Sequence, residues 1–364
     1  MTAIERSIVM STETTKTRSE KGRKARNDVL EYLDTQSGQV VSIKPKPEIE
    51  SVSQARAFLK ELRIRKKLKQ KNIPCLKHIA FKRTMNFFKF YFIEKQWEIQ
   101  LNMITKHLRH QMKIDHIKYI CYQLFTATSY LHSCNLIHKN INLRTVMINK
   151  SSDIGLCDLR FDIDRPELDF SIRDGVIKRN YFAPEVLFNA RRLTEKIDIW
   201  AIGCCLYEML FGESLSQNKN YISVVRSIYR RMKMSDKKLT IKEKRREQDE
   251  ILKMLSKVSI SDFLRSVGHE NEEALDLLSK CLEIDPRKRI SARKALKHPF
   301  LSKYYKEEDL MSEFFWVNSS FHADESLNLN QLKLVIMAEI NEFNKETGAE
   351  ELDIKEFKYF MGLR

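Results

Sequence analysis

The chain has 364 residues, of which 42% are hydrophobic and 10% aromatic, and this composition indicates a globular protein and excludes a wholly disordered one. The formal net charge is +16, but the basic runs at 63–67 and 237–246 lack interleaved aromatic residues, so we interpret them as solvated helix faces and a surface loop, not as a nucleic-acid site. The seven cysteines form no C-x-x-C pair and are odd in number, which predicts reduced thiols. No stretch approaches the roughly 20 apolar residues that a membrane span needs. We therefore expect a location in the cytoplasm, the nucleus or both.

The first third of the chain reads as a tail followed by strands and one helix. Residues 1–21 carry few apolar anchors and predict a disordered basic tail. Two short apolar segments, Asn27–Leu33 and Gln39–Lys44, flank a polar turn and predict a β-hairpin. Apolar residues at helical spacing predict an amphipathic helix from Ser53, and the aromatic run Phe87–Ile93 predicts a buried strand.

After about Gln96 the pattern becomes helical. Apolar residues between Ile117 and Leu131 recur at helical spacing and predict a long buried helix. Further helices are predicted at Ile197–Phe211, 221–232, Asn271–Cys281 and 330–343. The densely charged segment 235–249 predicts an exposed insertion. Strands followed by helices predict an α+β fold with a small sheet lobe, a larger helical lobe and a cleft between them.

Several short motifs follow one another in a fixed order. They read F-L-K-E-L-R at 58–63, H-K-N-I-N-L-R-T at 138–145, C-D-L-R at 157–160, Y-F-A-P-E at 181–185, D-I-W-A-I-G-C at 198–204 and D-P-R-K-R-I at 285–290. The set resembles the H-R-D-L-x-x-x-N, D-F-G and A-P-E signatures of eukaryotic protein kinases, and within them the mitogen-activated protein kinases. The resemblance covers the chain from about residue 22 to residue 343.

The resemblance implies a bilobal protein kinase fold. Its β-rich N-lobe would span 22–96, its helical C-lobe 97–302, and a C-terminal extension at 303–364 would pack back on the lobes. It also implies two structural roles. Glu185 and Arg289 would form a buried ion pair, and Asp198 would brace the backbone of the catalytic loop.

The resemblance further implies a site for ATP and magnesium. Lys44 would contact the phosphates, Glu61 would pair with Lys44, and Asp158 would bind the metal. Taken without the resemblance, Lys44 and Glu61 are an ordinary strand lysine and an ordinary helix carboxylate. Residues 22–27 align with the glycine-rich loop but keep only its first glycine, and Arg160 stands at the glycine of D-F-G. We therefore expect ATP binding to be weakened and magnesium to have one site at most.

The catalytic loop departs from the family at three chemically decisive positions. Asn140 stands where the family has the aspartate that accepts the proton of the substrate hydroxyl. An amide keeps the shape of a carboxylate but cannot take a proton, and losing a positioned base lowers a rate roughly 10²–10⁴-fold. Thr145 replaces the asparagine that holds a second magnesium, and Asn142 replaces a lysine that balances charge on the transferred phosphoryl group. No residue is therefore assigned as the catalytic base.

Three other segments bear on regulation and partners. Residues 173–175 replace the family's Thr-x-Tyr phosphorylation pair, so phosphorylation there is excluded. Glu94, with the bulky Trp97 after it, aligns with the link between lobes and is expected to narrow the adenine pocket. The acidic run Glu307, Glu308 and Asp309 aligns with a patch that docks basic and apolar peptide motifs, although such a run is also common on a solvated surface.

These observations lead to two hypotheses of different classes. The first is a pseudokinase that resembles mitogen-activated protein kinases and acts by binding, as a scaffold or regulatory component of a kinase signalling pathway. The second is a slow or unconventional ATP-dependent serine/threonine kinase that uses Lys44, Glu61 and Asp158, with Thr145 or Asn142 recruited to the metal.

Overall fold

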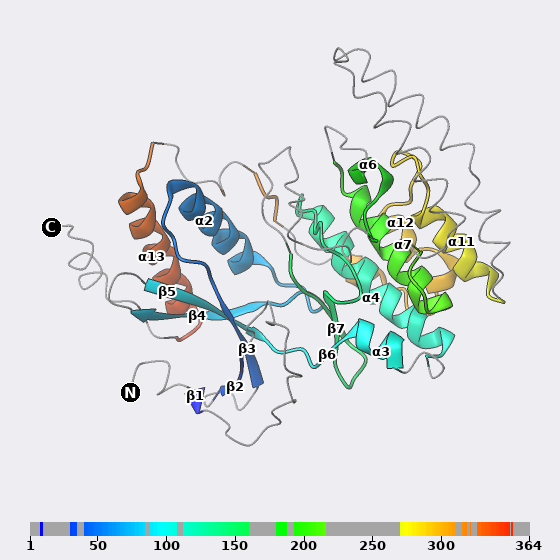
Figure 1. The fold of residues 1–364 in the computed structure, drawn as a ribbon, viewed down its shortest axis with the longest axis horizontal. Coiled ribbons are helices and arrows are strands. Elements are labelled where there is room, and N and C mark those ends of the chain that lie inside the picture. Colours follow the sequence, from blue (N-terminus) through cyan, green and yellow to red (C-terminus); the bar gives the residue numbers. More distant parts are fainter. Residues whose placement is uncertain are drawn as a thin grey trace, which may run out of the picture. The chain divides into compact units, whose positions relative to one another are not determined.

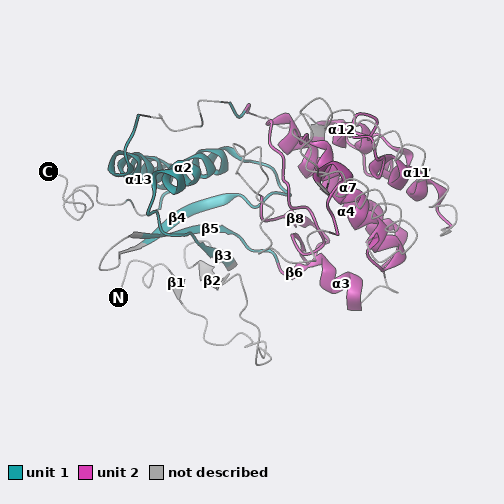
Figure 2. Ribbon diagram, turned by 45° about the horizontal axis from the view of Figure 1, so that its top comes forward, with its two compact units in different colours: residues 1–97, 317–364 teal, residues 98–316 magenta. Residues whose placement is uncertain are grey.

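The computed structural model describes residues 8–9, 30–34, 40–83, 88–107, 112–159, 180–187, 193–215, 270–310, 315–318, 321, 326–349 and 351. The chain divides into two compact units, residues 1–97 with 317–364 and residues 98–316 (Figure 2). The first unit is rich in strands and the second in helices, which confirms the predicted α+β class. The predicted tail, the glycine-loop segment, Arg160, residues 173–175, the helix at 221–232 and the insertion at 235–249 lie outside the described residues.

An antiparallel sheet forms the centre of the β-rich unit, with strand order β1-β2-β3-β5-β4 (Figure 1). Its strands are β1 (Ile8–Val9), β2 (Leu30–Asp34), β3 (Val40–Pro45), β4 (Leu76–Arg83) and β5 (Phe88–Lys95). The predicted hairpin is β2 with β3, and the predicted aromatic strand is β5. Strand β4, at one edge of the sheet, has no counterpart among the predicted elements.

Two helices cover one face of this sheet, and they lie side by side in Figures 1 and 2. They are α2 (Val52–Lys67) and α13 (Leu329–Glu346), and each begins with a capping box, at Ser51 with Gln54 and at Asn328 with Gln331. The core between helices and sheet is formed by apolar side chains of α2, β4, β5 and α13, among them Leu59, Phe92 and Ile336. The end of the C-terminal extension is therefore part of the β-rich unit.

Polar contacts also join α13 to its neighbours. The side chain of Asn344 is fully buried, and its amide accepts from Ile79 N at 3.0 Å and donates to Ile79 O at 2.9 Å. Glu339 accepts from Arg63 at 2.8 Å and from Lys66 at 2.8 Å. Our interpretation of the basic run at 63–67 as a solvated face is therefore wrong for Arg63 and Lys66, because α13 covers the helix face that carries them. It is also wrong for Arg65, which is buried and paired with Glu61 and Glu94.

The helical unit is built around α4 (Ile114–Ser133) and α7 (Lys196–Phe211), both predicted from the sequence. The remaining described helices are α3 (Leu101–His107), α6 (Pro184–Leu187), α11 (Glu272–Cys281) and α12 (Ala292–Leu296). A small antiparallel sheet of β6 (Ile99–Gln100), β7 (Val146–Ile148) and β8 (Ile154–Leu156) lies in the same unit. Gly203 of α7 packs so closely on Leu282 that a Cβ at this position would lie 2.8 Å from the leucine side chain.

The seven cysteines are free thiols, in agreement with the prediction. Five of them are buried in the helical unit, and burial raises the pKa of each thiol: Cys121, Cys134, Cys204, Cys205 and Cys281. They act as small apolar residues in the core. Within the described part of the chain, no helix combines the length and the apolar character needed to cross a membrane.

Candidate functional site

A short loop between α4 and β7 contains the residues that align with the kinase catalytic loop. Its backbone is held by Asp198 in the first turn of α7, whose carboxylate accepts from His138 N at 2.8 Å and from Lys139 N at 2.9 Å. His132 Nε2 lies 3.0 Å from the same carboxylate. Burial alone would raise the pKa of Asp198, but these donors outweigh it and lower the pKa, so the group is ionised. The bracing role expected of Asp198 is confirmed.

This brace fixes an uncommon backbone conformation. Lys139 has φ 64°, in the left-handed region that non-glycine residues seldom occupy. His138 is fully buried, and its Nδ1 accepts from Asn140 N at 3.3 Å. Burial lowers the pKa of His138 to about 4, so the ring is neutral and carries its proton on Nε2. The loop thus has a defined shape around the neutral, buried ring of His138.

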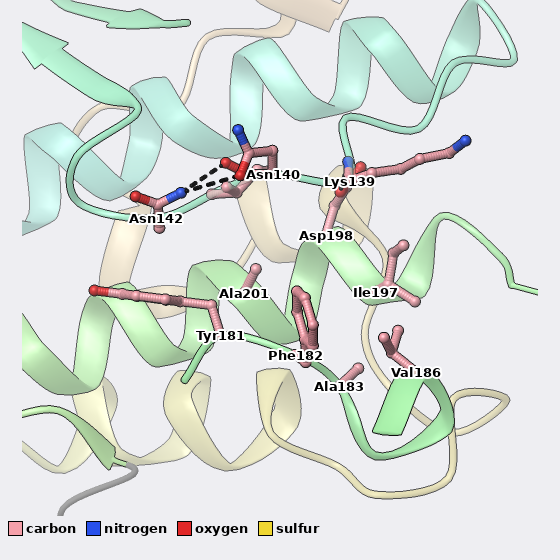
Figure 3. A pocket seen from close by; sticks show the side chains of 11 residues that line it. Lys139, Asn140, Asn142, Tyr181, Phe182, Ala183, Val186, Ile197, Asp198 and Ala201 are labelled. Atoms are coloured by element: carbon pink, nitrogen blue, oxygen red, sulfur yellow. Dashed lines mark hydrogen bonds between the residues drawn. The ribbon is translucent and has the colours of Figure 1, made fainter. Parts of the chain in front are cut away.

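Asn140 lies at the centre of a polar network in this loop. Its carbonyl oxygen accepts from Thr145 Oγ1 at 2.8 Å and from Asn142 Nδ2 at 2.9 Å, the latter contact being visible in Figure 3. Its own amide Nδ2 lies 3.5 Å from the carbonyl oxygen of Asp158, at the long limit of a hydrogen bond. Asn140 and Asp158, predicted as neighbours in the site, are therefore brought together.

Thr145 is buried, and its hydroxyl faces the loop backbone. The Oγ1 atom lies 2.8 Å from Asn140 O and 3.0 Å from Asn142 O, and it accepts from Asn142 N at 3.1 Å. A hydroxyl has one proton and two lone pairs, so these partners occupy most of its hydrogen-bonding capacity. The hydroxyl closes the loop internally.

Asp158 follows the β7–β8 hairpin, at the position of the metal-binding turn. The hydrogen bond from Cys157 N to Thr145 O, 2.8 Å long, ties this turn to the catalytic loop. Asp158 is exposed and has φ 60°, while the next side chain, Leu159, is 8% exposed. Leu159, which aligns with the phenylalanine of D-F-G, is therefore buried.

A shallow pocket, partly open to solvent, lies beside this loop (Figure 3). It is lined by Lys139, Asn140, Ile141, Asn142, Tyr181, Phe182, Ala183, Val186, Ile197, Asp198 and Ala201. Its walls are mainly apolar, and two amide side chains stand at its edge.

The segment 181–186, which lines one side of this pocket, is fixed by an ion pair between Glu185 and Arg289. Arg289, with a fully buried side chain, donates to both carboxylate oxygens of Glu185, at 2.6 and 3.0 Å. Arg289 also donates to the carbonyl oxygens of Lys196 and Glu283, each at 2.8 Å. The expected ion pair is therefore present, with geometry typical of a bidentate arginine–carboxylate contact.

The residues predicted to bind ATP phosphates lie in the β-rich unit, but their pairing differs from the prediction. Glu61 accepts from Lys46 at 2.5 Å and from Arg65 at 3.0 Å. Lys44 lies 3.0 Å from Glu94, which also binds Arg65. We expected Lys44 to be the partner of Glu61, and the structure gives this place to Lys46, the residue that directly follows the end of β3. Lys46 and Arg65 were missed by sequence reasoning, although K-P-K at 44–46 and the i,i+4 spacing of Glu61 and Arg65 were visible signals.

Glu94 has two charged partners that were not predicted from the sequence. It is 1% exposed and lies on the face of β5 that is turned towards α2, with Lys44 and Arg65 as partners. Burial would raise the pKa of Glu94, but the charges of Arg65 and Lys44 outweigh burial and lower the pKa. Glu94 thus has an internal ion-pair role, and the expected narrowing of an adenine pocket stays a prediction.

The described residues fit a nucleotide and magnesium only in part. Asp158 presents one exposed carboxylate, but the Thr145 hydroxyl and the Asn142 amide are turned into the loop. In the part of the chain that the structure describes, no group of three or more His, Cys, Asp or Glu side chains is arranged to hold a metal ion. When bound, magnesium would supply charge neutralisation on the phosphates, and the exposed carboxylate of Asp158 would be the group to hold it.

The predicted acidic patch forms a short 3₁₀ turn, η5 (Glu307–Leu310), in the helical unit. Glu307 and Glu308 are exposed, whereas Asp309 accepts from Tyr122 OH at 2.5 Å. Burial and the Asp309 carboxylate raise the pKa of Tyr122 to about 12, so its hydroxyl stays protonated and donates. Two carboxylates of the patch face solvent, and the third holds the turn on α4.

Comparison with known proteins identifies the family. Residues 20–301 match the family model described as protein kinase domain. The chain is 28% identical to the mitogen-activated protein kinase pmk-1 of Caenorhabditis elegans over 318 residues, which cover 86% of this chain and 82% of that protein. It is also 28% identical to mpk-1 of the same organism (90% and 74% covered) and to HOG1 of Candida albicans (88% and 84% covered), both mitogen-activated protein kinases. The chain therefore belongs to the protein kinase family and has mitogen-activated protein kinases among its relatives.

Proposed function

We propose that this protein is a pseudokinase that resembles mitogen-activated protein kinases and works in a kinase signalling pathway by binding other proteins, with little or no phosphoryl transfer. The observation that carries the proposal is the hydrogen-bond network around Asn140. The loop retains its brace from Asp198, while the group at the proton-acceptor position is an amide. Its shape is kept by contacts that need no carboxylate at position 140, no metal and no nucleotide.

The sizes of the expected losses favour binding over catalysis. Without a carboxylate at Asn140 the rate falls roughly 10²–10⁴-fold, and without the lysine that Asn142 replaces it falls by a further factor on the order of 10². The two factors need not multiply, because catalytic groups act together. Even the smaller loss alone would place a kinase of typical rate, about 1–100 turnovers per second, at or below one per second.

The second candidate, a slow or unconventional protein kinase, is favoured by one observation. Asp158 combines an exposed carboxylate with a left-handed backbone, a conformation that aspartate adopts more readily than most non-glycine residues. Its carboxylate is therefore accessible to a magnesium ion. Under this alternative, the metal would be held by Asp158 and water molecules, because Thr145 and Asn142 are engaged in the loop.

The partner surface of the proposed pseudokinase includes the acidic patch, which we define as Glu307, Glu308 and Asp309. Its two exposed carboxylates can attract a basic peptide, and the aromatic rings of Tyr119 and Tyr304, 5.1 Å apart, provide apolar surface in the same unit. The partners are therefore proposed to be pathway proteins with basic and apolar docking motifs. A location in the cytoplasm or nucleus stays a prediction.

The binding half of the proposal is tested by titration calorimetry with a synthetic peptide that carries three arginines followed by two spaced leucines. We expect wild type to bind it and the variant Glu307→Lys/Glu308→Lys to bind at least about tenfold more weakly, because charge attraction becomes repulsion. The matched control is Glu213→Lys/Glu272→Lys, which makes the same charge change at exposed positions of the helical unit. Equal loss in both variants would show that only net charge matters, and would contradict a docking patch.

A further inference from the structure

The β-rich unit contains five charged side chains that form one connected network. They are the cations Lys44, Lys46 and Arg65 and the carboxylates Glu61 and Glu94. The exposed fractions of these side chains range from 23% for Lys44 to 1% for Glu94, so the network lies largely inside the unit. Its members come from β3 and the residue after it, from β5, and from helix α2.

The carboxylate of Glu94 is the central member. It lies on the sheet and binds one cation from the sheet, Lys44, and one from the helix, Arg65. A fully buried carboxylate is strongly unfavourable without such partners, so Glu94 requires Arg65 to stay close to β5. Because Arg65 belongs to the last turn of α2, this requirement fixes the end of that helix against the sheet.

The second carboxylate, Glu61, is one helical turn earlier and makes a parallel connection. It binds Arg65 within the helix and Lys46 beyond the end of β3. Both Lys46 and Arg65 also lie over the ring of Phe92, at 4.4 and 5.7 Å from its centroid. The helix is therefore attached to the sheet at two successive turns through charges and an aromatic ring that this chain supplies itself.

In the protein kinase mechanism, a single strand lysine pairs with the helix glutamate and also contacts the nucleotide phosphates, so the position of the helix and the bound nucleotide are coupled. Here Lys46 contacts Glu61, and Lys44 is paired with Glu94. Each of the two lysines thus has a protein carboxylate at hydrogen-bonding distance. The arginine–glutamate contact adds a connection between helix and sheet that involves neither lysine.

We propose that Glu94 and Arg65 form an internal latch that holds helix α2 on the sheet without a nucleotide. The inference does not depend on the proposed lack of phosphoryl transfer, because it concerns the position of a helix and not the chemistry of the catalytic loop. It adds a consequence to the proposed function. A binding surface that includes α2 and the α13 helix packed on it stays formed whether or not ATP is present.

The test is hydrogen exchange of the α2 amides in the full chain, with and without magnesium and ATP. Wild type is expected to protect α2 fully in the absence of nucleotide, with no more than about twofold further protection when ATP is added. Glu94→Gln removes the carboxylate that Lys44 and Arg65 share, and Arg65→Leu removes the helix cation from the buried Glu94. Each variant is expected to speed exchange of the α2 amides about 10²–10³-fold.

Two further variants make the result specific. The double variant Glu94→Leu/Arg65→Leu removes both charges and should return α2 exchange to within about tenfold of wild type, because an apolar pair can replace a buried ion pair. Lys67→Leu removes an exposed cation from the same helix and should leave exchange unchanged. If α2 in wild type is unprotected until ATP is added, or if Glu94→Gln and Arg65→Leu exchange like wild type, there is no latch.

Discussion

Replacing Thr145 by valine separates a structural hydroxyl from a metal ligand. Valine keeps the shape of threonine but removes the hydroxyl, so Asn142 N loses its acceptor inside a buried loop. The carbonyl of Asn140 keeps a second donor, the Asn142 side chain at 2.9 Å, and contributes little to the loss. One unpaired buried N–H costs about 1–3 kcal/mol, and we expect the free energy of unfolding to fall by this amount without any magnesium present.

The assay is urea unfolding of wild type and Thr145→Val in a buffer that contains a metal chelator. Thr126→Val is the matched control, because Thr126 is also buried. Its hydroxyl donates to the carbonyl oxygen of Tyr122 at 2.9 Å, and this carbonyl also accepts a backbone hydrogen bond within the helix. We expect Thr126→Val to change the free energy of unfolding by less than about 1 kcal/mol. The reasoning is refuted if Thr145→Val is as stable as wild type in chelator and loses only the stabilisation given by magnesium and ATP.

Three further predictions concern charge and polar contacts elsewhere. Burial lowers the pKa of His138 from 6.5 to about 4. The free energy of unfolding should therefore be highest above pH 6.5 and fall by up to about 3 kcal/mol as the pH approaches 4. In His138→Gln, the free energy of unfolding measured in urea should depend less on pH across this range. Asn344→Leu leaves the N–H and carbonyl of Ile79 unpaired and should lower the free energy of unfolding of the β-rich unit by about 2–4 kcal/mol, with faster exchange of β4 amides. Glu339→Gln weakens the contacts with α2 and should cost about 0.5–1 kcal/mol in low salt and less in about 1 M salt, as thermal unfolding at both salt concentrations would measure.

The elements that sequence reasoning predicted are those with strong internal patterns. Helices α4 and α7 are long and carry apolar residues over many turns, and α13 shows a clear apolar stripe. They could therefore be predicted from the sequence without knowledge of their tertiary contacts. Strand β4 was missed because L-K-H-I-A-F-K-R has no regular alternation. It becomes a strand through pairing with β5, and its register is irregular between Leu76 and His78.

The site shows the same division between local and tertiary information. The identity of Asn140 and Thr145 was read directly from motif order, and so was the brace by Asp198. The ion pairs of the β-rich unit were not predictable in the same way. Lys44 lies in β3 and Lys46 directly follows that strand, and only the packing of α2 decides which of them meets Glu61. Long-range partners of charged side chains depend on packing, which one sequence does not encode in any local pattern.

The central claim is that an amide at Asn140 leaves this kinase fold with little or no phosphoryl transfer. Its most direct test is incorporation of labelled γ-phosphate into a generic basic protein substrate by purified wild type, run beside Asp158→Ala and beside a mitogen-activated protein kinase of ordinary activity. We expect incorporation by wild type to be at least about 10²-fold below the active kinase and equal to that of Asp158→Ala. Transfer by wild type at an ordinary kinase rate, abolished by Asp158→Ala, would contradict the account.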